Sequence, residues 1–144
     1  MATKRTNSKL TVCILSPHPL VLGEFERLLA KSPFKVIVKQ LESTLAPDLR
    51  TLDPPKANVY VVDGHAARPA TGALLTNLLE RSPESRLIVV GEQHTDSNSY
   101  SLLRLGVKGL LTYVEARDQL MRALPLVAAG GFCCLLYTSD AADE

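Results

Sequence analysis

The chain has few of the residues that build disulfide-rich, metal-binding or base-stacking proteins. Its 144 residues include no tryptophan, and aromatic residues make up 5% of the sequence, which argues against a platform for stacking single-stranded nucleic acid. The three cysteines, Cys13, Cys133 and Cys134, give neither a disulfide framework nor zinc-ligand spacing. No apolar run approaches the roughly 18 residues of a membrane span, and Leu10–Leu15 is too short for the core of a signal peptide. We therefore expect a cytoplasmic protein that does not contact a membrane.

Charge is nearly balanced, and apolar residues are plentiful. The formal net charge is +1, which does not mark a nucleic-acid-binding protein. Apolar residues make up 46% of the chain and the mean hydropathy is +0.08, so disorder over most of the chain is excluded. A chain of this length forms one domain and buries roughly 68–70% of its unfolded surface. Residues 1–9, which are basic, are expected to form a flexible arm ahead of that domain.

The last eleven residues look foreign to the rest of the chain. Residues 134–144 resemble, at every position, the translation of a transposon-end sequencing adapter used in library preparation. The alternative is a short natural acidic tail. If the segment is adapter-derived, it carries no biology, and the gene continues beyond it. Its removal takes away three acidic residues and no basic ones, which raises the net charge from +1 to +4.

Five short apolar runs recur at intervals of 23 to 28 residues. They are Thr11–Leu15, Val36–Val38, Val59–Val62, Leu87–Val90 and Leu110–Leu111. Several are β-branched and continuous instead of alternating, which is the pattern of strands buried on both faces of a parallel sheet. Helical apolar stripes lie between the runs, around Val21–Leu29, Leu74–Leu79, Leu102–Leu105 and Leu120–Ala128.

Prolines mark two places where the helical pattern is weak. Thr44–Leu52 is a poor helix candidate, with Pro47 in its first turn and Pro54–Pro55 after its end. Pro125 lies inside the last helical stripe, where a proline removes a hydrogen bond and costs about 3 kcal/mol in a helix interior. We predict a kink or an early break of that helix at Pro125. Gly130–Gly131 supplies the stop signal after it.

This alternation predicts an α/β fold of the flavodoxin-like, doubly wound class. Five strands in about 120 residues give a parallel sheet of order 2-1-3-4-5 with right-handed crossovers. In such folds the functional crevice lies beyond the carboxyl ends of the strands. The residues selected by that rule are Ser16, Pro17, His18, Asp63, Gly91 and Tyr113.

Asp63 is the most informative residue of this set, because it ends the central apolar run Val59–Val62. A carboxylate there is costly unless it faces the crevice or is paired. Its position alone allows two interpretations, a nucleophilic or metal-binding carboxylate and a cap for the helix that follows.

Four segments in order resemble a bacterial response-regulator receiver domain of the LuxR/NarL type, which precedes a helix-turn-helix DNA-binding domain. These are Ile14–Val21 (ILSPHPLV), Val61–Asp63 (VVD), Gly106–Leu111 (GVKGLL) and Ala128–Gly131 (AAGG), and the match covers residues 10–132. The resemblance implies a CheY-like fold. It also implies that the aspartate at position 63 accepts a phosphoryl group from a histidine kinase, with Mg²⁺ bridging carboxylate and phosphoryl oxygens.

The sequence departs from the family pattern around that aspartate. Ser16 and Pro17 occupy the places of an acidic pair that holds Mg²⁺ in the family. Gly91 stands where the family has a residue with a hydroxyl group, and Tyr113 stands where it has a lysine. The backbone carbonyl of His65 remains as a metal ligand by analogy. With two negative charges missing, Mg²⁺ should bind Asp63 weakly if at all. The sequence thus predicts a degenerate, or pseudo-, receiver with no resident metal or cofactor.

The sequence also allows other functions. A genuine receiver would still be phosphorylated on Asp63 by a kinase and would then need Mg²⁺. His18, His65 and Asp63 could hold a transition metal, although His18 also fits as part of the family motif. An enzyme such as a nucleotide or flavin protein would need a glycine-rich phosphate loop, which the sequence lacks. Expected partners are a second copy or an output domain, with DNA contacted only through a missing carboxyl-terminal domain.

Overall fold

The structure is a computed structural model that describes residues 10–41, 56–64, 68–92, 96–131 and 133–134. Within these residues the helices and strands follow in the order β1 (Thr11–Ser16), α2 (Pro19–Leu28), β2 (Lys35–Gln40), β3 (Val59–Asp63), α3 (Arg68–Arg81), β4 (Arg86–Gly91), α4 (Asp96–Leu105), β5 (Gly109–Thr112), α5 (Tyr113–Ala128) and β6 (Cys133–Cys134). The basic arm, the weak helix predicted at Thr44–Leu52 and residue His65 lie outside the described residues.

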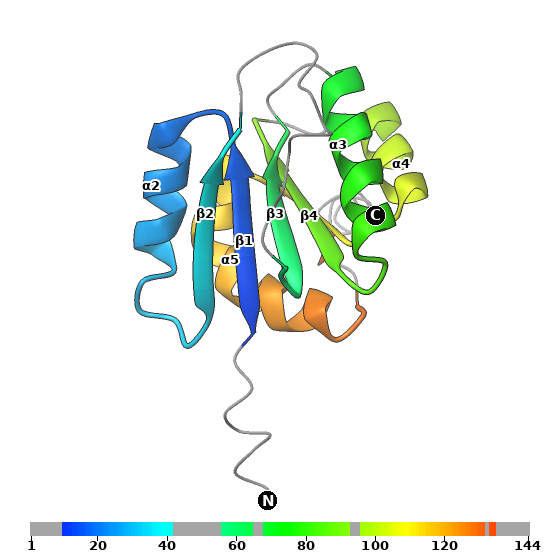
Figure 1. Cartoon of the computed structure of the whole chain (residues 1–144). Coiled ribbons are helices and arrows are strands. Elements are labelled where there is room, and N and C mark those ends of the chain that lie inside the picture. Colours follow the sequence, from blue (N-terminus) through cyan, green and yellow to red (C-terminus); the bar gives the residue numbers. More distant parts are fainter. Residues whose placement is uncertain (1–9, 42–55, 65–67, 93–95, 132, 135–144) are drawn as a thin grey trace, which may run out of the picture.

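The strands form one parallel sheet of order β2-β1-β3-β4-β5-β6 (Figure 1). The predicted order 2-1-3-4-5 is confirmed. The sequence did not predict β6, which adds two residues to the outer edge of β5, Cys133 beside Gly109 and Cys134 beside Leu110. Its second residue is the first of the segment that resembles an adapter.

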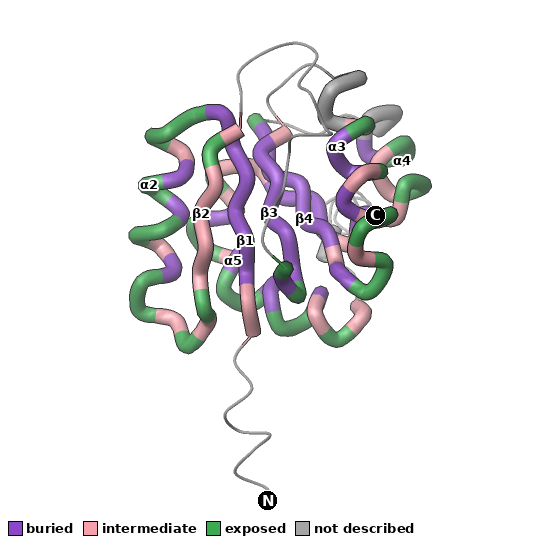
Figure 2. Tube along the Cα trace, in the orientation of Figure 1, coloured by how far each residue is buried: buried purple, intermediate pink, exposed green. Residues whose placement is uncertain are grey.

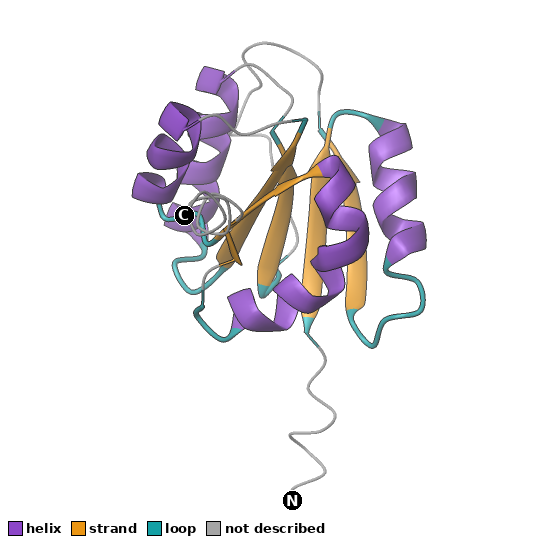
Figure 3. Cartoon of the chain, turned by 180° about the vertical axis from the view of Figure 1, so that it is seen from behind, coloured by secondary structure: helices purple, strands orange, loops and turns teal. Residues whose placement is uncertain are grey.

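Continuous apolar runs form the central strands because both faces of the sheet are covered. Strands β1, β3 and β4 are buried almost throughout, whereas β2 is half-buried at the edge of the sheet (Figure 2). On one face Val12 and Ile14 pack in a cluster with α2 and α5. On the other face Cys13 and Leu15 pack with residues from α3 and α4. Figure 3 shows α2 and α5 together on their shared face of the sheet.

Pro125 does not end the last helix, so the predicted early break is wrong. Helix α5 continues to Ala128, and the N–H of Ala129 donates to the carbonyl of Pro125. The reason is position. Pro125 lies in the final turn with its ring exposed, so its missing N–H leaves only the carbonyl of Met121 without a helical donor. No helix in the described part of the chain is long and apolar enough to cross a membrane.

Candidate functional site at the carboxyl edge of the sheet

The residues selected from the sequence meet where the parallel strands end. Ser16 ends β1, Asp63 ends β3 and Gly91 ends β4, while Tyr113 is the first residue of α5 directly after β5. The carboxyl ends of parallel strands lie at the same edge of the sheet, so residues that are distant in sequence become neighbours there. The side chains of Ser16 and Asp63 are almost completely buried, and Pro17 and Gly91 are buried as well.

The carboxylate of Asp63 accepts a hydrogen bond on each of its two oxygens. The hydroxyl of Ser16 donates to Oδ2 at 2.7 Å. The phenol of Tyr113 donates to Oδ1. Only 2% of Asp63 is exposed. A buried carboxylate is costly unless hydrogen bonds replace its hydration, and these two hydroxyls supply that replacement.

Local helix chemistry directs Tyr113 toward Asp63. Thr112 is the N-cap of α5. Its side chain accepts from the N–H of Glu115, and the carboxylate of Glu115 accepts from the N–H of Thr112. This capping box fixes where α5 begins and therefore where its first side chain points. Tyr113 is thus held over the end of the sheet, where its phenol can reach β3.

Ser16 is also bound from the loop that follows it. Its Oγ accepts a hydrogen bond from the N–H of His18 at 3.0 Å while it donates to Asp63. This orients the hydroxyl, because the backbone amide takes one lone pair and leaves the proton for the carboxylate. His18 is the N-cap residue of α2, and its side chain is exposed.

Burial raises the pKa of Tyr113 well above its ordinary value of 10, and the hydrogen bond to Asp63 and the charges of Asp63 and Glu92 raise that pKa further. The folded chain therefore keeps a phenolic proton that the unfolded chain releases near pH 10. By linkage, the free energy of unfolding should fall as pH rises above about 10.

This pH dependence can be measured by denaturant unfolding of the native chain and of Tyr113→Phe between about pH 9 and 11. The native chain should lose stability more steeply. The pKa of Cys13 is raised to about 11 and that of Tyr60 is also raised, so both groups lower the free energy of unfolding as pH rises. Both groups are present in both proteins, so the comparison isolates Tyr113. If the free energy of unfolding falls equally with pH in both proteins, the phenol of Tyr113 does not keep its proton through a hydrogen bond to Asp63.

The residues present at this edge do not fit Mg²⁺, which the resemblance to receiver domains implies. Mg²⁺ prefers oxygen ligands in octahedral array and usually one or two carboxylates. Ser16 offers a neutral hydroxyl already bonded to Asp63, and the side chain of Pro17 has no ligand atom. Asp63 is then the one acidic ligand among the positions that match the family motif. His65, whose carbonyl was considered as a ligand, is outside the described residues.

The transition-metal alternative includes His65, which lies outside the described residues, so it stays a hypothesis. Among the described residues, no three histidine, cysteine or acidic side chains lie close enough together to hold a metal ion. His18 contributes its backbone amide to the site, through the bond to Ser16.

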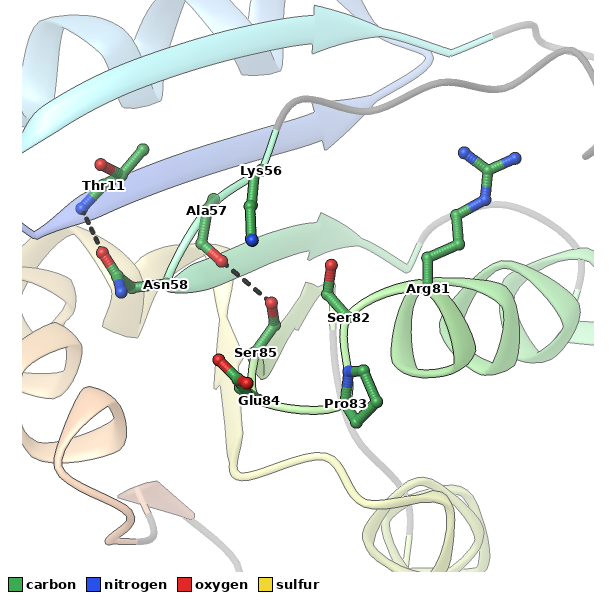
Figure 4. A pocket seen from close by; sticks show the side chains of 9 residues that line it. All are labelled: Thr11, Lys56, Ala57, Asn58, Arg81, Ser82, Pro83, Glu84 and Ser85. Carbon is green, nitrogen blue, oxygen red and sulfur yellow. Dashed lines mark hydrogen bonds between the residues drawn. The ribbon is translucent and has the colours of Figure 1, made fainter.

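A hollow lies at the opposite, amino-terminal edge of the sheet (Figure 4). It has a volume of about 400 Å³ and is polar. Two of its hydrogen bonds join neighbouring chain segments. The hydroxyl of Ser85 donates to the carbonyl of Ala57 at 2.9 Å, and the N–H of Thr11 donates to Oδ1 of Asn58 at 2.9 Å. These polar groups therefore connect the segments from which β1, β3 and β4 begin.

Sequence reasoning found the residues around Asp63 but not their bonds. The bond from Ser16 depends on rotation of a hydroxyl, and the bond from Tyr113 depends on the start of α5. Glu92, whose charge acts on Tyr113, was not singled out. The signal that could have found it is its place directly after β4, at the same edge of the sheet.

No protein-family model and no curated protein matches the chain. Solved structures do. The isolated receiver domain of RcsB from Salmonella enterica serovar Typhimurium has 20% identity and a TM-score of 0.70, over 94% of this chain and 100% of that chain. A LuxR-family two-component response regulator from Aurantimonas has 16% identity and a TM-score of 0.70, over 88% of this chain and 89% of that one. A pilus assembly-related protein from Burkholderia pseudomallei has 20% identity and a TM-score of 0.70, over 85% of this chain and 91% of that one.

These identities are low, and the likeness lies in the backbone. The helices and the five predicted strands, in the order 2-1-3-4-5, are what the chain has in common with such structures. The chain therefore has the CheY-like, flavodoxin-type fold of response-regulator receiver domains.

Proposed function

We propose that the chain is a receiver-like regulatory domain that works through protein contacts and without phosphorylation of Asp63. The observation that carries this proposal is the state of the carboxylate, which is 2% exposed and hydrogen-bonded on both oxygens. A phosphoryl donor has to reach one of those oxygens, and the hydroxyls of Ser16 and Tyr113 already occupy both of them. The positions that would supply charge for phosphoryl transfer carry Ser16, Pro17 and Tyr113.

The rest of the assignment follows the resemblance to LuxR/NarL-type receivers. Residues 10–132 would be the regulatory domain of a cytoplasmic, non-enzymatic two-component regulator. We attribute residues 134–144 to adapter sequence, and the regulatory domain would control a DNA-binding output domain that the gene encodes beyond residue 133. DNA would then be contacted through that output domain alone. Without the adapter-like segment the net charge is +4, from 16 basic and 12 acidic residues, and this modest excess is consistent with that division of roles.

The second candidate function is a genuine phospho-accepting receiver that uses Asp63 with weak Mg²⁺ binding. Asp63 favours it, since the acid is retained at the end of the central strand. In this case a histidine kinase is a partner, and the bonds from Ser16 and Tyr113 must open before transfer.

One experiment separates the two candidates. The chain is incubated with a small acyl phosphate donor and Mg²⁺, and acyl phosphate is quantified by intact mass, with Asp63→Asn as the matched control. Our proposal expects no added phosphoryl mass on either protein. Acyl phosphate on the native chain that is absent from Asp63→Asn, formed to high occupancy within minutes, would establish the second candidate.

A further inference from the structure

The hollow at the amino-terminal edge of the sheet takes no part in the function proposed above. It lies between the segment that leads into β3 and the loop that joins α3 to β4, and its volume is about 400 Å³. Sites for small molecules typically have volumes of roughly 300–1,000 Å³. Seven of its nine lining residues are polar or charged (Figure 4). The hollow therefore has the size and the polarity of a site for a small polar molecule.

Hydrogen bonds hold the walls of the hollow in place. The N–H of Asn58 donates to the carbonyl of Thr11 at 2.9 Å, and the carbonyl of Asn58 accepts from the N–H of Arg86 at 3.0 Å. The hydroxyl of Ser85, a residue that is 6% exposed, donates to the carbonyl of Ala57. A site whose walls are held in this way loses little conformational freedom when a ligand binds.

Three hydroxyl groups gather on the side of the hollow that faces the core. Ser82 and Ser85 line the hollow, and Tyr60, which is 2% exposed, lies behind them. Burial raises the pKa of Tyr60, and hydrogen bonds with the side chains of Ser82 and Ser85 act against that rise, so the phenol lies within reach of both serines. Ser82 is only partly buried, so its hydroxyl is accessible to a ligand in the hollow.

Positive charge predominates around the hollow. Lys56 and Arg81 belong to its lining, and Glu84 is the one acidic residue there. Arg86 adds a further positive charge beside the loop, where it donates to the carbonyl of Glu84 at 2.7 Å. No ion pair among the residues that the structure describes involves Lys56. Figure 4 shows the side chains of Lys56 and Ser82 extending into the space between their two segments. An anionic group would be attracted to this space.

A phosphate monoester suits these groups better than a carboxylate does. It carries a charge of about −1.5 to −2 at neutral pH, which two cations can balance. Its three free oxygens can accept hydrogen bonds from separate directions, and Lys56 comes from one wall while Arg81 and Ser82 come from the other. The phosphate group alone would leave room in the hollow. Thr11 and Asn58 also line the hollow and can bind the hydroxyl groups of a polar ligand.

We propose that the hollow binds a small phosphate monoester with a polar body, such as a sugar phosphate, and that Lys56, Arg81 and Ser82 donate to its phosphate group. The site goes beyond the proposed function and does not depend on it, because the hollow and Asp63 lie at opposite edges of the sheet.

The test is an amide NMR titration of the full chain with ribose 5-phosphate at neutral pH. The native chain should bind it with a dissociation constant on the order of 1 mM, and the shifted amides should be those of residues 56–58 and 81–86. Inorganic phosphate should shift the same amides but bind at least about threefold more weakly, because it lacks the polar body. Ribose, which lacks the charge, should bind at least about tenfold more weakly.

Three variants test which charges act on the ligand. Lys56→Gln should weaken the binding of ribose 5-phosphate at least about fivefold, because a charged donor to the phosphate is lost. Glu84→Gln should strengthen binding about twofold or more, because it removes a negative charge beside the phosphate. Lys31→Gln is the matched control, because Lys31 is an exposed lysine that does not line the hollow, and it should bind as the native chain does. All three side chains are exposed, and the spectrum of each variant shows whether it folds.

Any of four results would overturn the proposal. These are no shift at residues 56–58 and 81–86 up to about 20 mM ribose 5-phosphate, shifts centred on Asp63, an unchanged affinity in Lys56→Gln, and binding of inorganic phosphate or ribose as tight as that of ribose 5-phosphate. A chain that binds ribose 5-phosphate in the hollow and also forms acyl phosphate on Asp63 would keep this inference and refute the proposed function.

Discussion

Four substitutions at the carboxyl edge of the sheet should convert the chain into one that binds Mg²⁺ and accepts a phosphoryl group. The variant carries Ser16→Asp, Pro17→Asp, Gly91→Thr and Tyr113→Lys. It supplies the acids, hydroxyl and cation that the resemblance to receivers calls for and removes both hydroxyls from Asp63. Each added carboxylate near the ion should raise Mg²⁺ affinity about tenfold or more, from the size of a charge–charge interaction at partly buried sites.

The same variant should depend on Mg²⁺ for its stability. Three carboxylates then share one buried edge and repel one another unless a cation lies between them. Its midpoint of thermal unfolding should therefore rise with added Mg²⁺, as expected for a ligand that binds only the folded state. The native chain should show no such rise. The four-fold variant with Asp63→Asn is the control for phosphorylation and should form no acyl phosphate. If the variant with four substitutions folds but its stability does not depend on Mg²⁺, the missing groups are not the reason why the native chain does not bind Mg²⁺.

The second large effect concerns the hydroxyls that hold Asp63. Ser16→Ala and Tyr113→Phe each remove one donor to a buried carboxylate. Hydrogen bonds to charged groups contribute about 1.5–3 kcal/mol, so each variant should lose about that much free energy of unfolding. Denaturant unfolding at neutral pH measures the loss.

A double-mutant cycle decides whether the loss comes from Asp63. In an Asp63→Asn background the side chain is neutral, and removing the phenol leaves no buried charge with a missing donor. Tyr113→Phe should therefore cost less there than in the native chain. Tyr100→Phe on α4 is the matched control. Tyr100 is 65% exposed, so its hydroxyl should contribute within about 0.5 kcal/mol. Equal costs of Tyr113→Phe in both backgrounds would mean that its hydroxyl does not stabilise the carboxylate.

The fold was predictable because it depends on patterns that are local in the sequence. Continuous β-branched runs such as Val59–Val62 form strands that are buried on both faces, and the helical stripes between them cover those faces. The order of the sheet came from the flavodoxin-like class that five such strands in about 120 residues indicate. The position of Asp63 at the end of β3 came from the same reasoning.

Geometry within the site was less predictable, because it depends on contacts between distant residues. Tyr113 could be identified as a replacement for a lysine, but a sequence does not show that its phenol reaches β3. Ser16 could be identified as a neutral residue in place of an acid, but not as a donor to Asp63. In both cases the bond depends on the angle at which one element ends and another begins.

Two features of the fold were missed for related reasons. The prediction of a break at Pro125 assumes the cost of a helix interior, whereas the residue lies in the last turn, where one helical hydrogen bond is lost and the ring is exposed. Strand β6 has two residues and pairs only with β5, so it is too short to show the pattern of apolar residues that predicts a strand.

The central claim is that Asp63 no longer operates a phosphoryl switch. It is tested most directly by amide NMR spectra of the native chain recorded with and without millimolar Mg²⁺ and beryllofluoride, which mimics a phosphoryl group on an aspartate. The four-fold variant serves as the positive control. The account predicts superimposable spectra for the native chain and shifted spectra for the variant. Shifts in the native chain that spread from Asp63 along β4, β5 and α4, and that vanish in Asp63→Asn, would contradict it.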